Sequence, residues 1–240
     1  RLEYRIDRLQ AGAGTFLALM SIGLLADWPL PQAIAALRHD WPELTLSVDV
    51  GTSAQQLHLL KSGQLDIGLL GGEVADDAVQ RTRIGSGQLL ALVPEDHALA
   101  KLPAITLEAM AEAGTLSLSS RGPIARIVNE RLAEKQIEFS PRIVASSIAA
   151  SPGLVRSLRQ PAIIDEFTSQ SANLTGLCAV PLQEPLRFDL YAVSCNLSGS
   201  GLVFMNALAA TLQEILSAPG TVDRRGPAGP PVSVGFRGGT

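Results

Sequence analysis

The segment Leu44–Gly72 constrains the fold more than any other part of this sequence, because its pattern changes from strand to helix and back to strand. Residues 44–50 alternate apolar and polar side chains, the period-two pattern of a strand with one apolar face. Residues 54–60 place an alanine and two leucines at helical spacing, and Gly63 follows as a helix-stop signal. Residues 65–70 form an apolar run that suits a buried parallel strand. The segment therefore predicts a βαβ unit.

The two predicted strands of this unit end at small, polar turns. The first opens onto Gly51-Thr52-Ser53 and the second onto Gly71-Gly72. In open α/β sheets, ligands bind outside the carboxyl ends of the strands. The unit therefore predicts a small-molecule site at these turns, although a fold alone never establishes one.

Composition limits the classes of protein to consider. The chain has 240 residues, 46% of them hydrophobic and 18% charged, which is ordinary for a globular protein of one or two domains. With a net charge of −4, the chain lacks the excess of basic residues that is typical of a nucleic-acid-binding domain. The longest apolar run, 15–26, is too short to span a membrane, and we interpret it as a strand and turn rather than a signal peptide.

Cysteine and histidine positions give no sign of a metal or a catalytic centre. Cys178 and Cys195 lack metal-type spacing, so we expect free thiols in a reducing, cytoplasmic compartment, with a disulfide as the minority interpretation. The three histidines are scattered and pair with no carboxylate or cysteine at ligand spacing. Walker, GxSxG and GxGxxG motifs are absent at the required positions. We expect no metal, no cofactor and no enzymatic activity.

The remainder of the chain repeats the alternation of strands and helices before and after Pro94, which suggests two similar α/β lobes. The segment Gly85-Ser86-Gly87 is interpreted as a plain turn. Because the chain begins with Arg, we expect a fragment of a longer protein whose residues 1–12 end a helix, and residues 218–240 are expected to be a flexible Pro/Gly-rich tail. Strands are predicted at 16–20, 89–93, 116–118, 142–145, 162–164, 177–180 and 188–195, and helices at 29–38, 106–114, 124–135, 153–158, 166–173 and 202–217.

Hydroxyl side chains recur in the turns that follow predicted strands. Each hydroxyl alone is better explained as a helix N-cap than as a ligand contact. Together they matter more, since hydroxyls and free N–H groups at helix N-termini suit a carboxylate or a similar anion. The residues in question are Ser21, Thr52, Ser53, Ser119, Ser120, Ser146 and Ser147.

Two charged residues lie near these turns. Arg121 could bind an anion in a bidentate manner, although an exposed surface position is an equal alternative. Asp165 could balance a cationic group on the same ligand, and its alternative role is to cap the helix that follows.

The segment PLPQAIAALRHDWPELTLSVDVGTSAQQLHLLKSGQLDIGLL, followed by LLALVPEDHALA, resembles the effector-binding domain of LysR-type transcriptional regulators. The matching positions include Leu30-Pro31, Pro42–Leu46, Gly63–Asp66 and Val93–Leu99. A looser match continues through 163–168. The resemblance covers about residues 13–217 and is most specific in its first part.

The resemblance implies an α/β fold of two Rossmann-like lobes, with the architecture of a type 2 periplasmic binding protein and a ligand cleft between the lobes. Lobe I would comprise residues 13–93 plus 188–217, and lobe II residues 94–187. Residues 1–12 would end the family's linker helix. The turns that contact effectors in the family correspond here to the hydroxyl-rich turns already named.

Two departures from the family pattern affect what is carried over. The winged helix-turn-helix is missing, so DNA contact would come only through an N-terminal domain outside this chain. Where the family has a G-x-G before the strand at Ile163, this chain has Pro161, which removes an N–H from that half of the site.

The sequence therefore predicts the effector-sensing domain of a regulator, a homodimer or homotetramer that binds a small carboxylate or amino-acid-like effector. Two alternatives remain open. A solute-binding protein of an uptake system has the same fold but needs export. An enzyme on this scaffold needs a nucleophile and base at the strand ends, where no histidine lies.

Overall fold

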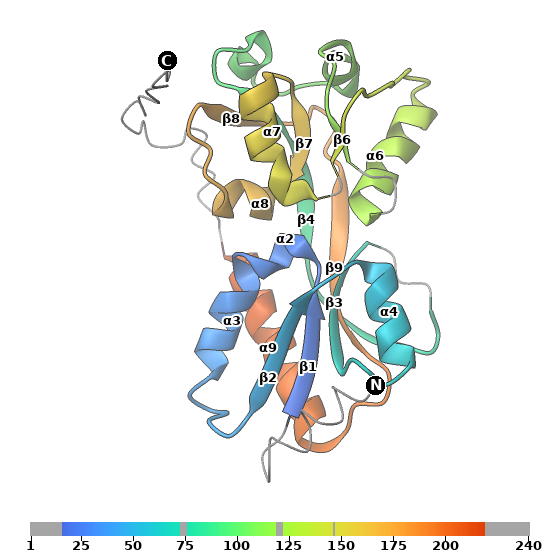
Figure 1. Ribbon diagram of the computed structural model, residues 1–240, viewed down its shortest axis with the longest axis vertical. Helices are drawn as coiled ribbons and strands as arrows, with labels where there is room; N and C mark the ends of the chain where they lie inside the picture. Colours follow the sequence, from blue (N-terminus) through green and yellow to red (C-terminus); the bar gives the residue numbers. More distant parts are fainter. Residues whose placement is uncertain (1–15, 73–75, 119–121, 146, 219–240) are drawn as a thin grey trace, which may run out of the picture.

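The structure is a computed structural model and describes residues 16–72, 76–118, 122–145 and 147–218. Figure 1 shows two α/β halves stacked along the long axis of the molecule, which we call the lower half and the upper half. The first three strands and the last helix lie in the lower half, and the middle of the chain forms the upper half. Two long strands, β4 (Gln80–Pro94) and β9 (Arg187–Ser194), run between the halves.

The lower sheet has the strand order β2-β1-β3-β9-β4. The strand β1 (Phe16–Ser21) is parallel to both β2 (Thr45–Val50) and β3 (Ile67–Gly71). The helix α4 (Ser53–Lys61) connects β2 to β3. This arrangement confirms the βαβ unit predicted from the sequence.

Helices cover both faces of the lower sheet. On one face lie α3 (Pro29–Leu37) and α9 (Gly199–Ser217), and on the other lies α4. The strand β1 is buried throughout, because Leu17 and Leu19 belong to one apolar cluster whereas Ala18 and Met20 belong to a second. Burial on both faces explains why this strand is a continuous apolar run.

The upper half is built on the far end of β4. From Leu89 onward, β4 pairs with β7 (Ala162–Asp165), and from Leu90 it also pairs with β8 (Leu177–Pro181). The remaining elements are β5 (Ser117–Leu118), β6 (Val144–Ala145), α5 (Leu107–Glu112), α6 (Pro123–Glu134), α7 (Ser151–Leu158), α8 (Glu166–Ser171) and the short 3-10 helices η1 (Ala98–Lys101) and η2 (Ile148–Ala150).

The main corrections to the predicted elements concern β4 and the chain after β1. The expected turn at Gly85-Ser86-Gly87 is wrong, because these residues lie inside β4 and pair with β9. The pairing register shifts between Arg83 and Gly85, so Gly85 accompanies a strand irregularity rather than a chain reversal. The stretch after β1 also forms a one-turn helix, α2 (Gly23–Ala26), where only a turn was expected.

The strand β2 is an exposed edge of the lower sheet. It pairs only with β1 among the described strands, and Val48 and Val50 are 44% and 62% exposed. The expected apolar face of 44–50 is therefore covered only in its first half, where Leu44 is buried. Within the described ranges, every helix is too short or too polar to cross a membrane. The expectations for residues 1–12 and 219–240 lie outside the described residues.

Candidate functional site

The carboxyl ends of the three parallel strands meet at the edge of the lower sheet that faces the upper half. Ser21 is the last residue of β1 and pairs in register with Val50 and Leu69. Its carbonyl oxygen accepts a hydrogen bond of 2.9 Å from the Gly51 N–H. The turns after β1 and β2 are thus joined by backbone, as the parallel pairing requires.

The turn after β2 starts α4 with an N-cap. The Thr52 Oγ1 accepts the backbone N–H of Gln55 at 3.2 Å. The next helical N–H, of Gln56, bonds to the Thr52 carbonyl. The N–H groups of Ser53 and Ala54 have no acceptor within the helix, since the first N–H groups of any helix lack one. The N-terminus of α4 therefore presents hydrogen-bond donors and a partial positive charge, which suit an anion.

Two side chains in the first turn of α4 contain buried polar atoms that no described group satisfies. The Ser53 Oγ is covered and has no hydrogen-bond partner among the described residues. Gln56 is fully buried, and although its Nε2 donates to the Gly51 carbonyl at 3.3 Å, its Oε1 is likewise without a partner there. Buried polar groups without a partner are costly and uncommon in folded proteins.

Gly68 leaves the space for Gln56 in this position, whereas Gly51 leaves space for its neighbours Met20 and Gln55. A Cβ at Gly68 of β3 would lie 2.9 Å from the Gln56 Oε1, and a Cβ at Gly51 would lie 2.5 Å from the Met20 Sδ. Gln56 thus packs directly over the strand backbone between α4 and the sheet. The expected apolar face of α4 is partly wrong, because Ala54 is exposed whereas Gln56 and Leu60 are buried. A glutamine four residues before a core leucine was the sequence signal that could have identified it.

Ser21 is fully buried, and its hydroxyl donates to the carbonyl of Ile22 at 3.0 Å. This bond leaves the lone pairs of the hydroxyl oxygen uncommitted in the described structure. Ser21, Thr52 and Ser53 therefore lie at one edge of the sheet, as the sequence predicted, but each has a different hydrogen-bond environment.

Asp165 occupies the corresponding position in the upper half, at the end of β7. Its Oδ1 accepts the Thr168 N–H at 2.8 Å and its Oδ2 accepts the Thr168 hydroxyl at 2.6 Å. The carboxyl is fully buried, and burial raises its pKa although both bonds from Thr168 favour the ionised form. The geometry is that of a helix N-cap for α8, the alternative role considered from the sequence.

Of the remaining predicted residues, Ser147 lies in the upper half. Ser147 is exposed and precedes η2 without capping it through its side chain. Ser119, Ser120, Arg121 and Ser146 lie outside the described residues. No hydrogen bond between described residues joins Ser147 or Asp165 to the α4 turn. The elements that follow Ser21, Ser147 and Asp165 do meet, because α2 contacts both η2 and α8.

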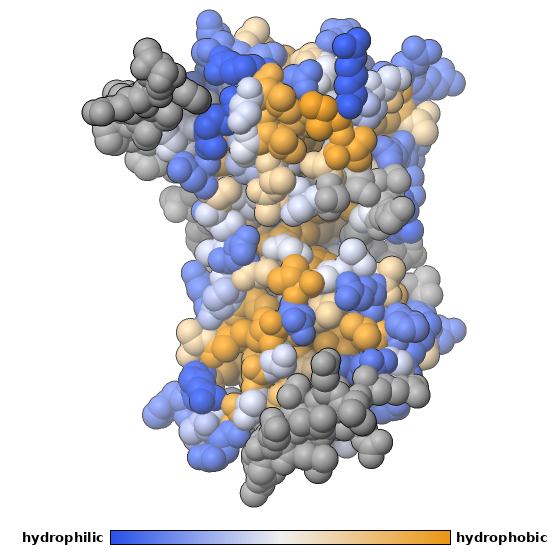
Figure 2. Space-filling view, in the orientation of Figure 1, coloured by the Kyte–Doolittle hydropathy of each residue, from blue (hydrophilic) through white to orange (hydrophobic). Residues whose placement is uncertain are grey.

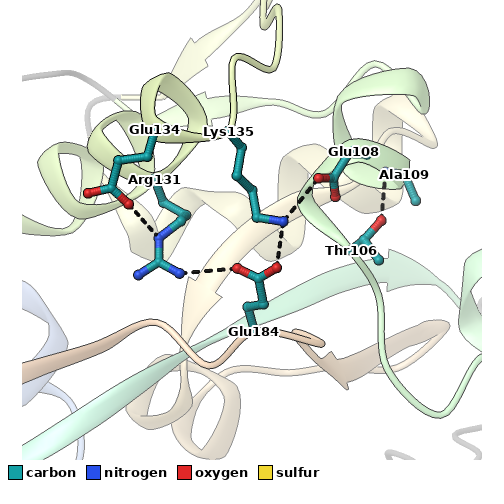
Figure 3. Close-up of polar contacts among 7 residues, drawn as sticks. All are labelled: Thr106, Glu108, Ala109, Arg131, Glu134, Lys135 and Glu184. Atoms are coloured by element: carbon teal, nitrogen blue, oxygen red, sulfur yellow. Dashed lines mark hydrogen bonds and ion pairs between the residues drawn. The ribbon is translucent and has the colours of Figure 1, made fainter.

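A cluster of charged side chains lies elsewhere in the upper half and connects α5, α6 and the loop before β9 (Figure 3). Lys135 binds Glu108 at 3.1 Å and Glu184 at 2.5 Å, while Arg131 binds Glu184 at 3.1 Å and Glu134 at 3.0 Å. The carboxylates raise the pKa of Lys135, and the cations lower the pKa of Glu184. These side chains are 27–67% exposed, so the cluster positions helices and contributes little energy.

A cavity of about 290 Å³ lies at the opposite edge of the lower sheet, beside the start of β1 and of α9. Leu17, Asp66 and Ser198 are among the residues that line it. Asp66 already accepts the Ala18 N–H at 2.9 Å. We do not place the site here, because ligands of parallel sheets bind at the carboxyl ends of the strands. Among the described residues, no group of three or more His, Cys, Asp and Glu side chains could hold a metal ion.

A family model described as "LysR substrate binding domain" matches residues 12–203. The match includes the βαβ unit, the upper half and both strands that run between the halves, β4 and β9, and it ends within α9. The chain belongs to the LysR substrate binding domain family. The resemblance identified from the sequence is therefore confirmed for the family.

Individual relatives are similar to only part of this LysR-family chain. It is 25% identical over 134 residues to a "Probable RuBisCO transcriptional regulator" of Gracilaria tenuistipitata var. liui, covering 53% of this chain and 43% of that protein. The chain thus spans about half the length of the relatives that it matches. The names of the relatives are those of transcriptional regulators rather than enzymes.

Solved structures agree on the fold. The BenM effector binding domain with its effector benzoate has a TM-score of 0.72 at 22% identity, covering 84% of this chain and 91% of that one. The CcmR regulatory domain of Synechocystis PCC6803 in complex with 2-PG has a TM-score of 0.75 at 16% identity, covering 82% and 97%. The predicted fold class, an effector-binding α/β fold of the periplasmic-binding-protein type, is confirmed.

Proposed function

We propose that this chain is the effector-sensing and oligomerisation domain of a cytoplasmic LysR-type transcriptional regulator and that it is not an enzyme. The effector is a small carboxylate or an amino-acid-like molecule bound between the two halves. Its acidic group binds at the start of α4, and Ser147 together with Ser119, Ser120 and Arg121 supplies further contacts. The lobes that we propose are 13–93 with 188–217 and 94–187, with the last residues of β4 before Pro94 extending from the first lobe into the sheet of the second. DNA contact belongs to the family's separate DNA-binding domain, in keeping with the acidic charge of this chain.

The observation that supports the proposal best is the open first turn of α4. Thr52 satisfies one N–H, whereas the N–H groups of Ser53 and Ala54 remain available to an anion. The Ser53 hydroxyl is buried without a described partner and could donate to the same ligand. Gln56 is also fully buried and incompletely satisfied. A carboxylate bound here would be recognised by charge and by directional donors.

Differential scanning fluorimetry with benzoate, a panel of amino acids and, as an uncharged control, benzamide tests this proposal. A ligand at 100 times its Kd adds about 2.7 kcal/mol of stability. For a chain of this size, that raises Tm by roughly 5–10 °C. We expect at least one carboxylate to produce such a shift and benzamide to produce none.

A matched pair of variants separates ligand contact from helix capping. Thr52→Ala removes the cap of α4, and Thr106→Ala removes the equivalent cap of α5, where the Thr106 Oγ1 accepts the Ala109 N–H at 3.1 Å. Each costs about 1 kcal/mol of stability through its cap. Only Thr52→Ala should also abolish the carboxylate shift. Equal ligand shifts in the two variants, or no shift with any acid, would contradict the proposed site.

The exposed edge strand supports self-association as a further part of the proposal. The outer edge of β2 is unpaired among the described residues, and Val48 and Val50 are largely exposed there. Figure 2 shows apolar side chains gathered on the viewed face of the lower half, over α3 and β2. Exposed edges with apolar side chains commonly pair with another chain. A second copy of this chain is the occupant that we propose.

The oligomeric state can be measured by light scattering on a size-exclusion column. We expect the wild type to elute as a dimer or tetramer and Val50→Glu to elute as a monomer, because a charge cannot be buried there without a partner. Val203→Glu changes an equally exposed valine, 59% exposed, on α9 and serves as the control. A monomeric wild type would rule out this part of the proposal without affecting the effector site.

A further inference from the structure

The pairing partners of β4 change where this strand passes from the lower half to the upper half. Gln88 still pairs with Arg187 of β9, whereas Leu89 pairs with Asp165 of β7. The crossing is reinforced by a bond of 2.9 Å from the Leu89 N–H to the Leu186 carbonyl. Any change in the angle between the halves must be absorbed near these residues.

Three aromatic rings lie across this point and come from three different parts of the fold. Phe188 belongs to β9, Phe167 belongs to α8 of the upper half, and Trp28 precedes α3 of the lower half. The Phe167 and Phe188 rings meet edge to face with centroids 6.3 Å apart. The Trp28 ring stacks on Phe167 at 6.2 Å with an angle of 15°. The stack thus joins the two halves directly.

The backbone of β4 is shaped to admit these rings. A Cβ at Gly87 would lie 2.5 Å from the Phe188 Cζ and 2.6 Å from the Phe167 Cε2. Real Cβ atoms do not approach so closely, so only glycine lets both rings lie against the strand. The residue that was interpreted from sequence as part of a turn therefore has a packing role at the crossing.

The helix that carries Phe167, α8, is attached to β4 by a polar contact. Glu166 accepts the backbone N–H of Gln88 at 3.1 Å, which attaches the start of α8 to β4. Phe167 and Phe188 are 3% and 4% exposed, whereas Trp28 is only half-buried. Trp28 is therefore the partner that can move away when the halves rotate, and α2 beside it also contacts α8 (Figure 1).

We infer that the Trp28–Phe167 stack is a latch that holds the two halves at one relative orientation, with Gly87 as the position that makes the stack possible. Opening or rotating the halves must separate these rings. An aromatic pair of this geometry changes the ratio of two arrangements by roughly two- to tenfold. The inference concerns the angle between the halves and does not depend on the identity of the effector.

Distance measurement between spin labels tests the latch in the full chain. Labels are placed at exposed positions of α3 and α6 by Ala36→Cys and Glu130→Cys, with Cys178→Ser and Cys195→Ser removing the native thiols. Pulsed electron–electron double resonance then gives the distribution of distances between the two labels, and so between the halves. We expect Trp28→Leu to shift or broaden this distribution, with the second population rising by roughly two- to tenfold.

Two further variants make the test independent of one substitution. Gly87→Ala displaces the rings without removing either, so it should alter the distribution in the same direction. Trp41→Leu is the matched control, because Trp41 packs edge to face on Phe204 at 5.4 Å within the lower half. Unchanged distributions in Trp28→Leu and Gly87→Ala, or an equal change in Trp41→Leu, would overturn the inference.

Discussion

The starts of α4 and α8 are built on the same local plan but differ in how completely their polar groups are satisfied. Each follows a strand, and each has a side-chain N-cap that accepts the N–H three residues later. At α8, Asp165 uses both carboxylate oxygens on Thr168. At α4, Thr52 satisfies one N–H and leaves the Ser53 hydroxyl and the Gln56 Oε1 without described partners.

This difference separates a structural helix start from one suited to a ligand. The Asp165 carboxyl group already accepts the Thr168 N–H and hydroxyl at the start of α8, so that helix offers little to an added anion. The start of α4 has no acidic residue in its first turn and keeps free donors. A hydroxyl-rich or acidic turn at a strand end is thus not enough to define a ligand site. The turn must also contain polar atoms that lack hydrogen-bond partners within the protein.

The largest expected effect on stability comes from removing the N-cap of α8. Asp165→Ala removes two hydrogen bonds and leaves the buried Thr168 N–H without its acceptor. We expect a loss of about 2 kcal/mol in the free energy of unfolding, measured by urea denaturation. Asp165→Asn keeps a capping oxygen and should cost less than about 0.5 kcal/mol. A carboxylate shift that survives in Asp165→Asn would support a purely structural role for Asp165.

The pH dependence of stability sharpens the same comparison. Burial raises the pKa of Asp165 above its ordinary value of 3.8, so the folded chain keeps this proton to higher pH than the unfolded chain. The resulting stability is complete below pH 3.8 and is lost as pH rises through the folded pKa.

The measurement is the difference in unfolding free energy between wild type and Asp165→Asn, followed upward from the acidic limit. For each unit by which the pKa of Asp165 is raised, the free energy of unfolding of the wild type should fall by about 1.4 kcal/mol relative to the variant as pH rises through the folded pKa. Other carboxyl groups, including Glu166, are common to both proteins and cancel in this difference. A difference that grows in favour of the wild type with pH would show that hydrogen bonding outweighs burial.

Much of the fold follows from local pattern. The strand β1 and the unit from β2 to β3 were predictable because apolar periodicity and glycine stops coincide there, and Gly63 indeed has a φ of +65°. The first part of β4 was not predictable. Its residues 80–88 are mostly polar or exposed, and their strand geometry depends on pairing with β9, about a hundred residues later in the chain.

The candidate site was predictable as a location but not as a set of contacts. Parallel strands bring Ser21 and Thr52 to one edge, which follows from topology alone. The Asp165 carboxyl group is fully engaged because of one neighbour, Thr168. Gln56 is buried because Gly68 of β3 leaves space for its side chain. Trp28 was missed because its contact, Phe167, lies in the other half of the molecule.

The smallest expected effect is a gain in stability rather than a loss, and it tests the incompletely satisfied N-terminus of α4. Ser53→Ala removes a buried hydroxyl that has no described partner, so the ligand-free chain should gain up to about 1 kcal/mol in unfolding free energy. The same change should weaken the stabilisation by the carboxylate found in the fluorimetry screen, because that hydroxyl is one of its proposed donors. Ser62→Ala, at the other end of α4, removes a hydroxyl that donates to the Leu59 carbonyl at 3.1 Å and should reduce stability slightly without changing the ligand response. A gain in stability together with a loss of ligand response is the pattern of a residue kept for binding rather than for folding. A loss of stability in Ser53→Ala would instead mean that its hydroxyl is satisfied in solution, and the difference between the two helix starts would then be smaller than the structure indicates.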